Sequence, residues 1–106
     1  MRHQDLDARS LALHRLVAEK LSREPALFEN ARATLARWRI IVCPSSQPYL
    51  IEWEQLFNQG MDAALAVATD PSEHATALRQ SSPFCGILTN EERWEFLKTW
   101  RQEHPR

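Results

Sequence analysis

A helix stop followed closely by a helix start, within residues 78–92, restricts the fold of this chain more than any other feature of its sequence. Pro83 lacks an amide donor and disfavours helical geometry in the residue before it, so a helix that enters this stretch should end near Ser82. Thr89 stands three residues before Glu92, the spacing at which a hydroxyl and a carboxylate cap a helix reciprocally. A new helix should therefore begin directly after the threonine.

Apolar residues fill the space between this helix stop and this helix start, and Gly86 interrupts them. A segment this short cannot form an amphipathic helix, so its side chains should enter the core, with Phe84 inserted between helices. Neither Cys85, in this segment, nor Cys43 belongs to a CxxC pair. Isolated cysteines beside apolar residues are usually small buried hydrophobes, so we expect neither of them to be a ligand or a nucleophile.

Apolar residues recur at three- and four-residue spacing through the rest of the chain, which is the period of an amphipathic helix. Prolines and cap residues separate these segments, and Asp7 and Asp70 are the expected caps of the first and the fifth. Helices are predicted over approximately residues 7–22, 25–40, 48–59, 61–69, 71–80 and 90–103, with frayed ends at 1–6 and 104–106. A chain of 106 residues has room for one domain. The sequence therefore predicts an all-α, compact single-domain bundle of five to six short helices over residues 1–106, without a β-sheet.

Charge is divided unevenly between the two halves of the chain. Residues 1–42 contain eight Lys or Arg and five Asp or Glu, whereas residues 43–106 contain five and nine. This asymmetry is too small to indicate nucleic-acid binding by itself, although it can orient a partner. The N-terminal region lacks the apolar run of a secretory signal or a membrane-spanning helix, so we expect no membrane association and a cytoplasmic location.

Motifs that carry enzyme chemistry are missing from the sequence. The chain has two glycines, too few for a glycine-rich phosphate loop, and it has no HExxH motif and no paired CxxC. We therefore predict a protein that is not an enzyme and that uses no cofactor and no metal. One alternative stays open, because His74 and Cys85, eleven residues apart, could meet in space as a catalytic pair.

The last predicted helix carries an unusually wide apolar arc, with two tryptophans and a phenylalanine within seven residues. Such an arc either packs in the middle of the bundle or leaves an aromatic edge exposed for a partner. Large aromatic residues and arginine dominate binding energy where they are exposed. The leading hypothesis is accordingly a non-enzymatic interaction protein, a regulatory partner of another protein, with Arg79, Trp94 and Trp100 as its partner-binding residues; the resemblance described below makes this partner antitoxin-like. Homo-oligomerisation stays open.

A small nucleic-acid-binding transcriptional regulator is the alternative hypothesis. Its contacts to phosphate would be Arg32, Arg37 and Arg39, on the basic face of residues 25–40. A helix-turn-helix reader, however, needs polar or basic residues at the start of its recognition helix, and here the arginines come late. Basic residues near the C-terminal end of a helix also complement its dipole, so nucleic acid is the less favoured partner.

Three short segments resemble those of a known group of proteins. They are residues 9–14 (Arg-Ser-Leu-Ala-Leu-His), residues 78–84 (Leu-Arg-Gln-Ser-Ser-Pro-Phe) and the tripeptide Glu92, Arg93 and Trp94. The chain resembles short uncharacterised bacterial helical proteins associated with toxin–antitoxin gene pairs, and the likeness spans most of its length. The resemblance implies a small cytoplasmic helical protein that holds another protein, such as a toxin of the nucleotidyltransferase type. It implies no catalytic residue.

Overall fold

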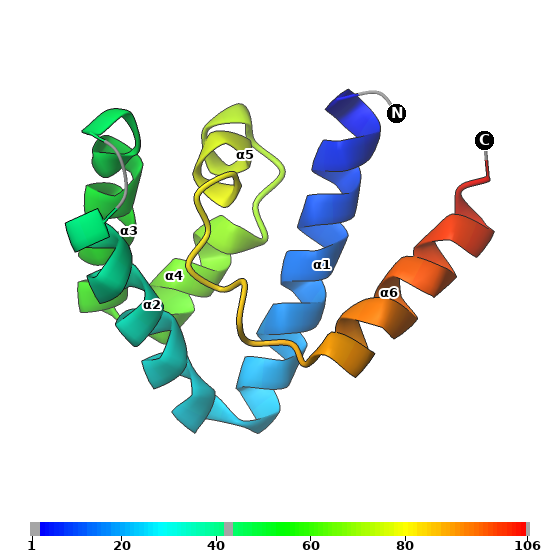
Figure 1. The fold of residues 1–106 in the computed structure, drawn as a ribbon, viewed down its shortest axis with the longest axis horizontal. Helices are drawn as coiled ribbons and strands as arrows, with labels where there is room; N and C mark the ends of the chain where they lie inside the picture. The colour runs from blue at the N-terminus through cyan, green and yellow to red at the C-terminus, as the bar shows by residue number, and fades with distance from the viewer. Residues whose placement is uncertain (1–2, 42–43, 106) are drawn as a thin grey trace.

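The computed structural model describes residues 3–41 and 44–105, and all regular secondary structure in these ranges is helical (Figure 1). The α-helices are α1 (His3–Arg23), α2 (Phe28–Ile41), α3 (Gln47–Gln59), α4 (Met61–Ala68), α5 (Glu73–Arg79) and α6 (Asn90–Glu103). Two short 3-10 helices, Pro25–Leu27 and Pro44–Ser46, precede α2 and α3. The predicted all-α bundle of five to six helices is confirmed.

Local signals set most of the helix boundaries. The Thr89 hydroxyl accepts the amide of Glu92 at 3.1 Å, and the Glu92 carboxylate accepts the amide of Thr89 at 2.8 Å, so both halves of the predicted capping box are present. Gly60 ends α3 with φ at 125°, a left-handed conformation that favours glycine. Both boundaries follow from side chains within a few residues of the helix end.

Two predicted caps are wrong. Helix α1 begins at His3, ahead of Asp7 and within the stretch expected to be frayed. Helix α5 is capped by Ser72, whose hydroxyl accepts the amide of Ala75 at 3.2 Å, while the Asp70 carboxylate accepts the hydroxyl of Ser72. At the start of α5 both Asp70 and Ser72 are residue types that cap helices, and the sequence did not rank them.

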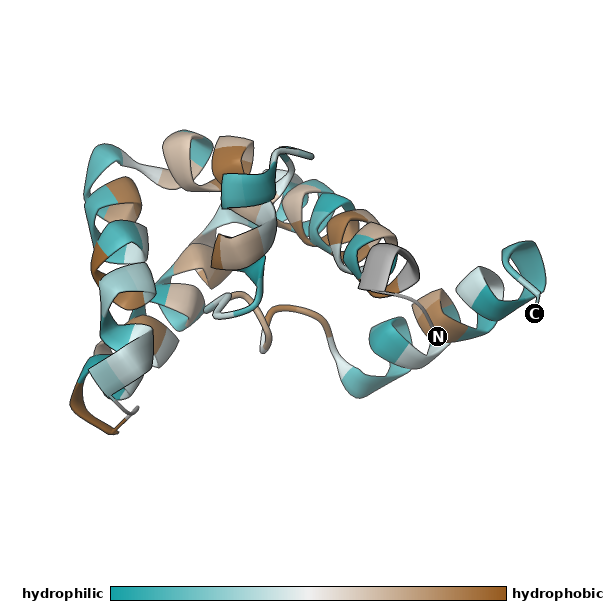
Figure 2. Cartoon of the chain, turned by 90° about the horizontal axis from the view of Figure 1, so that it is seen from above, coloured by the Kyte–Doolittle hydropathy of each residue, from teal (hydrophilic) through white to brown (hydrophobic). Residues whose placement is uncertain are grey.

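The helices form an open, U-shaped arrangement (Figure 1). Helices α2 and α3 pack as a hairpin, α4 packs against α3, and α1 contacts both α4 and α5. The segment from residue 80 to residue 89 crosses the middle of the U and leads into α6, which diverges from α1. In the view from above, α6 again stands apart from the other helices (Figure 2).

Phe84 occupies the centre of the core, as the sequence predicts. Its side chain is 2 % exposed, and its ring centroid lies 5.4 Å from that of Phe57, 5.7 Å from that of Trp53 and 6.4 Å from that of Phe28. The indole N–H of Trp53 donates to the carbonyl of Leu78 at 2.9 Å. The aromatic cluster therefore joins α2, α3 and the end of α5 to the crossing segment.

Burial was predicted for both cysteines as well as for Phe84. Cys85 is exposed, so its predicted burial is wrong, although Phe84 before it and Ile87 after it are buried. The chain turns outward at Cys85 and Gly86, between the buried Phe84 and Ile87, so the thiol lies at the surface. Cys43 lies outside the described residues. Among the described helices, none combines the length and the hydropathy needed to cross a membrane.

Candidate partner-binding surface

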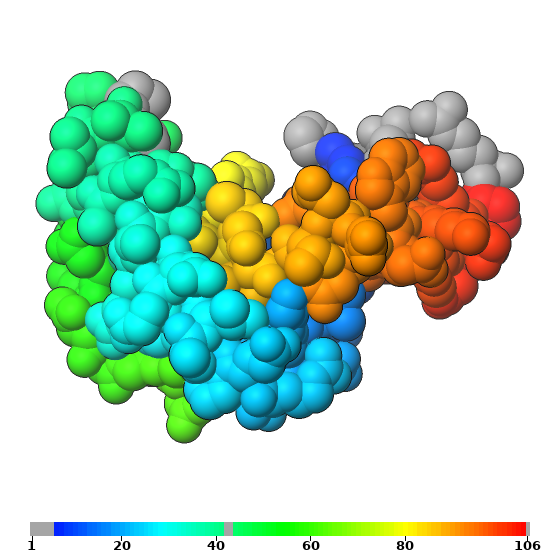
Figure 3. Space-filling model, turned by 60° about the horizontal axis from the view of Figure 1, so that its bottom comes forward, coloured from blue at the N-terminus to red at the C-terminus, as the bar shows by residue number. Residues whose placement is uncertain are grey.

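Helix α6 carries apolar side chains that the rest of the described chain does not fully cover. None of its 14 residues is buried, and Trp94 is 64 % exposed. Phe96, Leu97 and Trp100 are half-buried. The space-filling view shows α6 (orange to red) projecting from the side of the molecule (Figure 3). Of the two alternatives that the sequence left open, core packing or an exposed edge, the structure shows the exposed edge.

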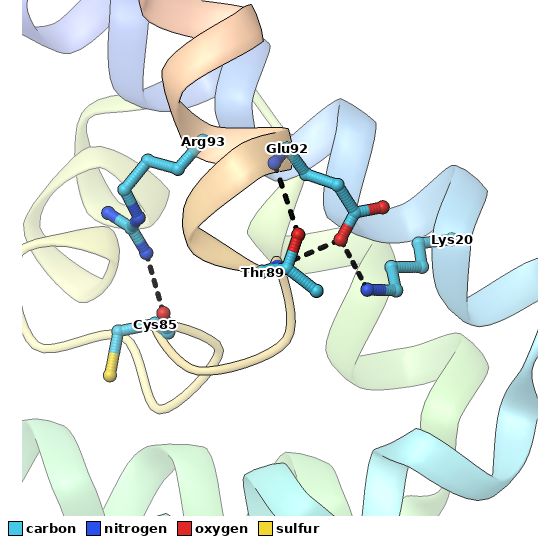
Figure 4. Close-up of polar contacts among 5 residues, drawn as sticks. All are labelled: Lys20, Cys85, Thr89, Glu92 and Arg93. Carbon is cyan, nitrogen blue, oxygen red and sulfur yellow. Dashed lines mark hydrogen bonds and ion pairs between the residues drawn. The ribbon is translucent and has the colours of Figure 1, made fainter.

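The base of α6 is attached by polar contacts (Figure 4). Lys20 on α1, whose side chain is 9 % exposed, donates to the Glu92 carboxylate at 2.5 Å. This hydrogen bond, with the one from the Thr89 amide, lowers the pKa of Glu92 to about 2. On the other side of the helix, the Arg93 guanidinium donates to the carbonyl of Cys85 at 2.6 Å. The first turn of α6 is therefore held in place although the rest of the helix is open.

The two predicted tryptophans lie on α6 but face different ways. Trp100 stacks between Phe96, with ring centroids 6.1 Å apart, and His104, with ring centroids 3.6 Å apart. Six residues along an α-helix correspond to a rotation that separates Trp94 from Trp100 by about 120°. Trp94 is thus the exposed aromatic, and Trp100 is partly covered by its own helix and the residue after it.

Arg79, the third predicted partner-binding residue, lies in the interior, at the end of α5. It is 5 % exposed, and its guanidinium donates to the carbonyls of Asp70 and Ala68 at 2.5 and 3.3 Å and to the hydroxyl of Thr76 at 3.0 Å. A partner anchor needs an accessible guanidinium, whereas this one holds the turn between α4 and α5. The structure does not bring Arg79 together with Trp94 and Trp100.

The arginines of the alternative nucleic-acid face are largely occupied by contacts within the chain. The Arg32 guanidinium lies over the Phe28 ring, donates to the carbonyl of Phe57 at 3.1 Å and pairs with Glu29 at 3.3 Å. Arg39 pairs with Glu54 at 2.9 Å. Of the three arginines, Arg37 is exposed, whereas Arg32 and Arg39 are half-buried. These contacts hold α2 on α3 and leave little free positive charge on that face.

The chain was compared with family models, curated proteins and solved structures. No family model, curated protein or solved structure matches the chain. The geometry of the chain itself therefore carries the functional argument.

A buried histidine that the sequence did not single out fastens the crossing segment to α1. His14 is 6 % exposed; its Nδ1–H donates to the carbonyl of Ser10 at 2.7 Å, which leaves Nε2 to accept the hydroxyl of Ser82 at 2.7 Å. The Ser82 oxygen also accepts the amide of Phe84. The sequence held one sign that His14 is buried. It stands three residues before Val17, so it shares the apolar stripe of α1.

This hydrogen-bonded pair lines a cavity of about 570 Å³ to which α1, the crossing segment and residues of α2, α3, α5 and α6 contribute. Cys85 lines the same cavity, whereas His74 pairs with the Glu52 carboxylate of α3 at 2.5 Å. No contact between described residues joins His74 to Cys85. The described residues also contain no group of three His, Cys, Asp or Glu side chains placed to hold a metal ion.

Acidification should destabilise the protein through His14. Burial lowers the pKa of His14 below its usual 6.5, so under acid the unfolded chain takes up a proton that the folded chain resists. The contribution of His14 to stability is complete above pH of about 6.5 and declines below it. Urea unfolding between about pH 7.5 and 5 should therefore show a falling free energy of unfolding, before Glu92 begins to lose its contribution below about pH 4.5.

His14→Gln is the matched control for this pH dependence, because glutamine keeps a hydrogen-bond acceptor but does not titrate. The difference in stability between the two proteins should narrow as the pH falls from about 7 to 5. Parallel curves for the two proteins over that range would contradict the assignment. The other histidines are present in both proteins, so their effect on the pH dependence cancels in the difference.

Proposed function

We propose that this protein is a non-enzymatic interaction module that binds another protein through the exposed face of α6. The observation that carries the proposal is a 14-residue helix with two tryptophans and no buried residue. Exposure of the large apolar surface of tryptophan to water is unfavourable, and tryptophan is enriched at the centres of protein interfaces. Arg79 takes no part in this proposal, because it is buried.

The surroundings of Trp94 suit an interface. A hollow beside its indole is rimmed by polar and charged side chains, namely Glu95, Lys98, Arg101 and Gln102. An aromatic centre with a polar rim is the usual anatomy of a protein–protein contact. Attachment of the first turn of α6 through Lys20 and Arg93 places the helix before binding, which reduces the entropy lost on association.

The resemblance to bacterial proteins of toxin–antitoxin pairs supplies the class of partner. The protein would act in the cytoplasm as an antitoxin-like partner that holds a toxin, for instance one of the nucleotidyltransferase type. Nothing in the described contacts favours the nucleic-acid alternative over this proposal, since Arg32 and Arg39 are engaged with Glu29 and Glu54.

Trp94→Ala should weaken partner binding at least about fivefold, since truncation of a tryptophan at the centre of an interface removes more than about 1 kcal/mol of binding free energy. Affinity purification from native cells identifies the stoichiometric partner, and calorimetry with the purified pair measures the loss. Ile40→Ala is the control, because Ile40 is 84 % exposed but lies at the end of α2. Absence of a stoichiometric partner, or equal losses in the two variants, would refute the proposal.

A further inference from the structure

A second feature of α6 is the groove that it forms with α1, here called the α1–α6 groove. It has a volume of about 320 Å³. Its apolar lining comes from Leu6 and Leu13 of α1 and from Phe96 and Leu97 of α6. The two helices diverge toward the C-terminal end of α6 (Figure 1). Neither wall is fully covered by other parts of the described chain.

The charged lining that the described residues give the α1–α6 groove is basic. Arg9 of α1 and Arg93 and Arg101 of α6 line it, and no carboxylate among the described side chains does. Among the described residues, none of these three arginines forms an ion pair. Glu92, on the first turn of α6, is bound to Lys20 instead. A chain with a formal net charge of −1 therefore gathers three arginines around one apolar groove, and of these only Arg93, which donates to the carbonyl of Cys85, has a polar partner among the described contacts.

We propose that the α1–α6 groove binds an acidic amphipathic helix of the partner protein, an inference that rests on the function proposed above. Apolar residues at helical spacing fill a groove of this kind, and the flanking carboxylates of such a helix match arginine in both charge and planar geometry. Nucleic acid would supply anionic phosphates but nothing for the floor made by Leu13, Phe96 and Leu97.

A partner helix bound in the groove would also reach the exposed Trp94. Trp94, Leu97 and Arg101 follow one another at three- and four-residue spacing, so they form one stripe along α6. Leu97 and Arg101 line the groove, and Trp94 therefore stands at its outer edge. A helix seated in the groove buries the aliphatic lining and contacts the indole in a single docking event.

Chemical-shift mapping on the isotopically labelled full chain tests this assignment. The probe is a synthetic amphipathic helix of about 18 residues with a leucine face flanked by glutamates, and the matched control peptide has lysine at every glutamate. The glutamate peptide should shift amides of α1 near Leu13 and of α6 near Leu97, and the lysine peptide should not. Arg9→Glu and Arg101→Glu should each weaken the binding at least about tenfold, whereas Arg37→Glu on α2 should leave it unchanged.

Several results would overturn the inference. One is that the glutamate peptide changes no chemical shifts. The same holds if the changes persist in both Arg9→Glu and Arg101→Glu. Another is a DNA duplex of about 20 base pairs that changes the chemical shifts of amides along the groove when the glutamate peptide does not. A third is self-association of the chain that Arg101→Glu abolishes, which would assign the groove to a second copy.

The native partner separates the failure of this inference from the failure of the proposed function. If Trp94→Ala abolishes capture of that partner but Arg9→Glu and Arg101→Glu do not, the function stands and the groove assignment falls. If the chain captures no stoichiometric partner, both fall. The spectrum of each unbound variant shows whether it retains the native fold, so unfolding is not mistaken for lost binding.

Discussion

Phe84→Ala should lower the free energy of unfolding by about 3–5 kcal/mol, because truncation of a buried phenylalanine loses transfer free energy and leaves a cavity. The ring is 2 % exposed and packs among four other aromatic rings, those of His14, Phe28, Trp53 and Phe57. A loss of this size is a large part of the total stability of a small domain, roughly 5–15 kcal/mol. Urea denaturation followed by circular dichroism measures it.

The control for this substitution is Trp94→Ala, which removes a larger side chain from a position that is 64 % exposed. Its effect on the free energy of unfolding should stay within about 0.5 kcal/mol, because surface substitutions rarely do more. An unchanged unfolding midpoint for Phe84→Ala would show that the crossing segment does not hold the bundle together. Comparison of the two variants separates the core of this fold from its proposed binding surface.

The helix boundaries could be predicted where the deciding groups are close in sequence. Pro83, the Thr89 and Glu92 pair and Gly60 each act within a single turn of helix, so the sequence alone indicates where a helix ends or begins. Insertion of Phe84 was predictable for a related reason, since an apolar residue in a short turn has few other places to go.

Burial of polar groups could not be predicted, because it depends on partners that are remote in sequence. His14 is satisfied by Ser82, 68 residues away, and Lys20 by Glu92, 72 residues away. A periodic pattern states which face of a helix is inward but not which neighbour meets it. The same limit applies to Cys85, whose exposure follows from the path of the crossing segment.

The candidate site was predicted only in part. The sequence indicated an aromatic last helix, but a wide apolar arc is equally compatible with a central helix and with a peripheral one. Only the packing of α1, α4 and α5 around one another shows that α6 is left outside. The α1–α6 groove needed both the neighbouring helix and the directions of Arg9 and Arg101, neither of which a one-dimensional pattern contains.

Arg79→Met should lower the free energy of unfolding by about 2–3 kcal/mol, because methionine keeps the apolar stem but removes hydrogen bonds from a charged donor to Asp70, Ala68 and Thr76. The turn between α4 and α5 then has carbonyl groups without their donor, and hydrogen exchange should accelerate there first. Arg37→Met, at an exposed position on α2, should change stability by less than about 0.5 kcal/mol. If Arg79→Met instead kept full stability and lost partner binding, the guanidinium would be a binding group, as the sequence suggested. Unfolding and binding measured on the same variant therefore decide between a structural and a binding role for this arginine.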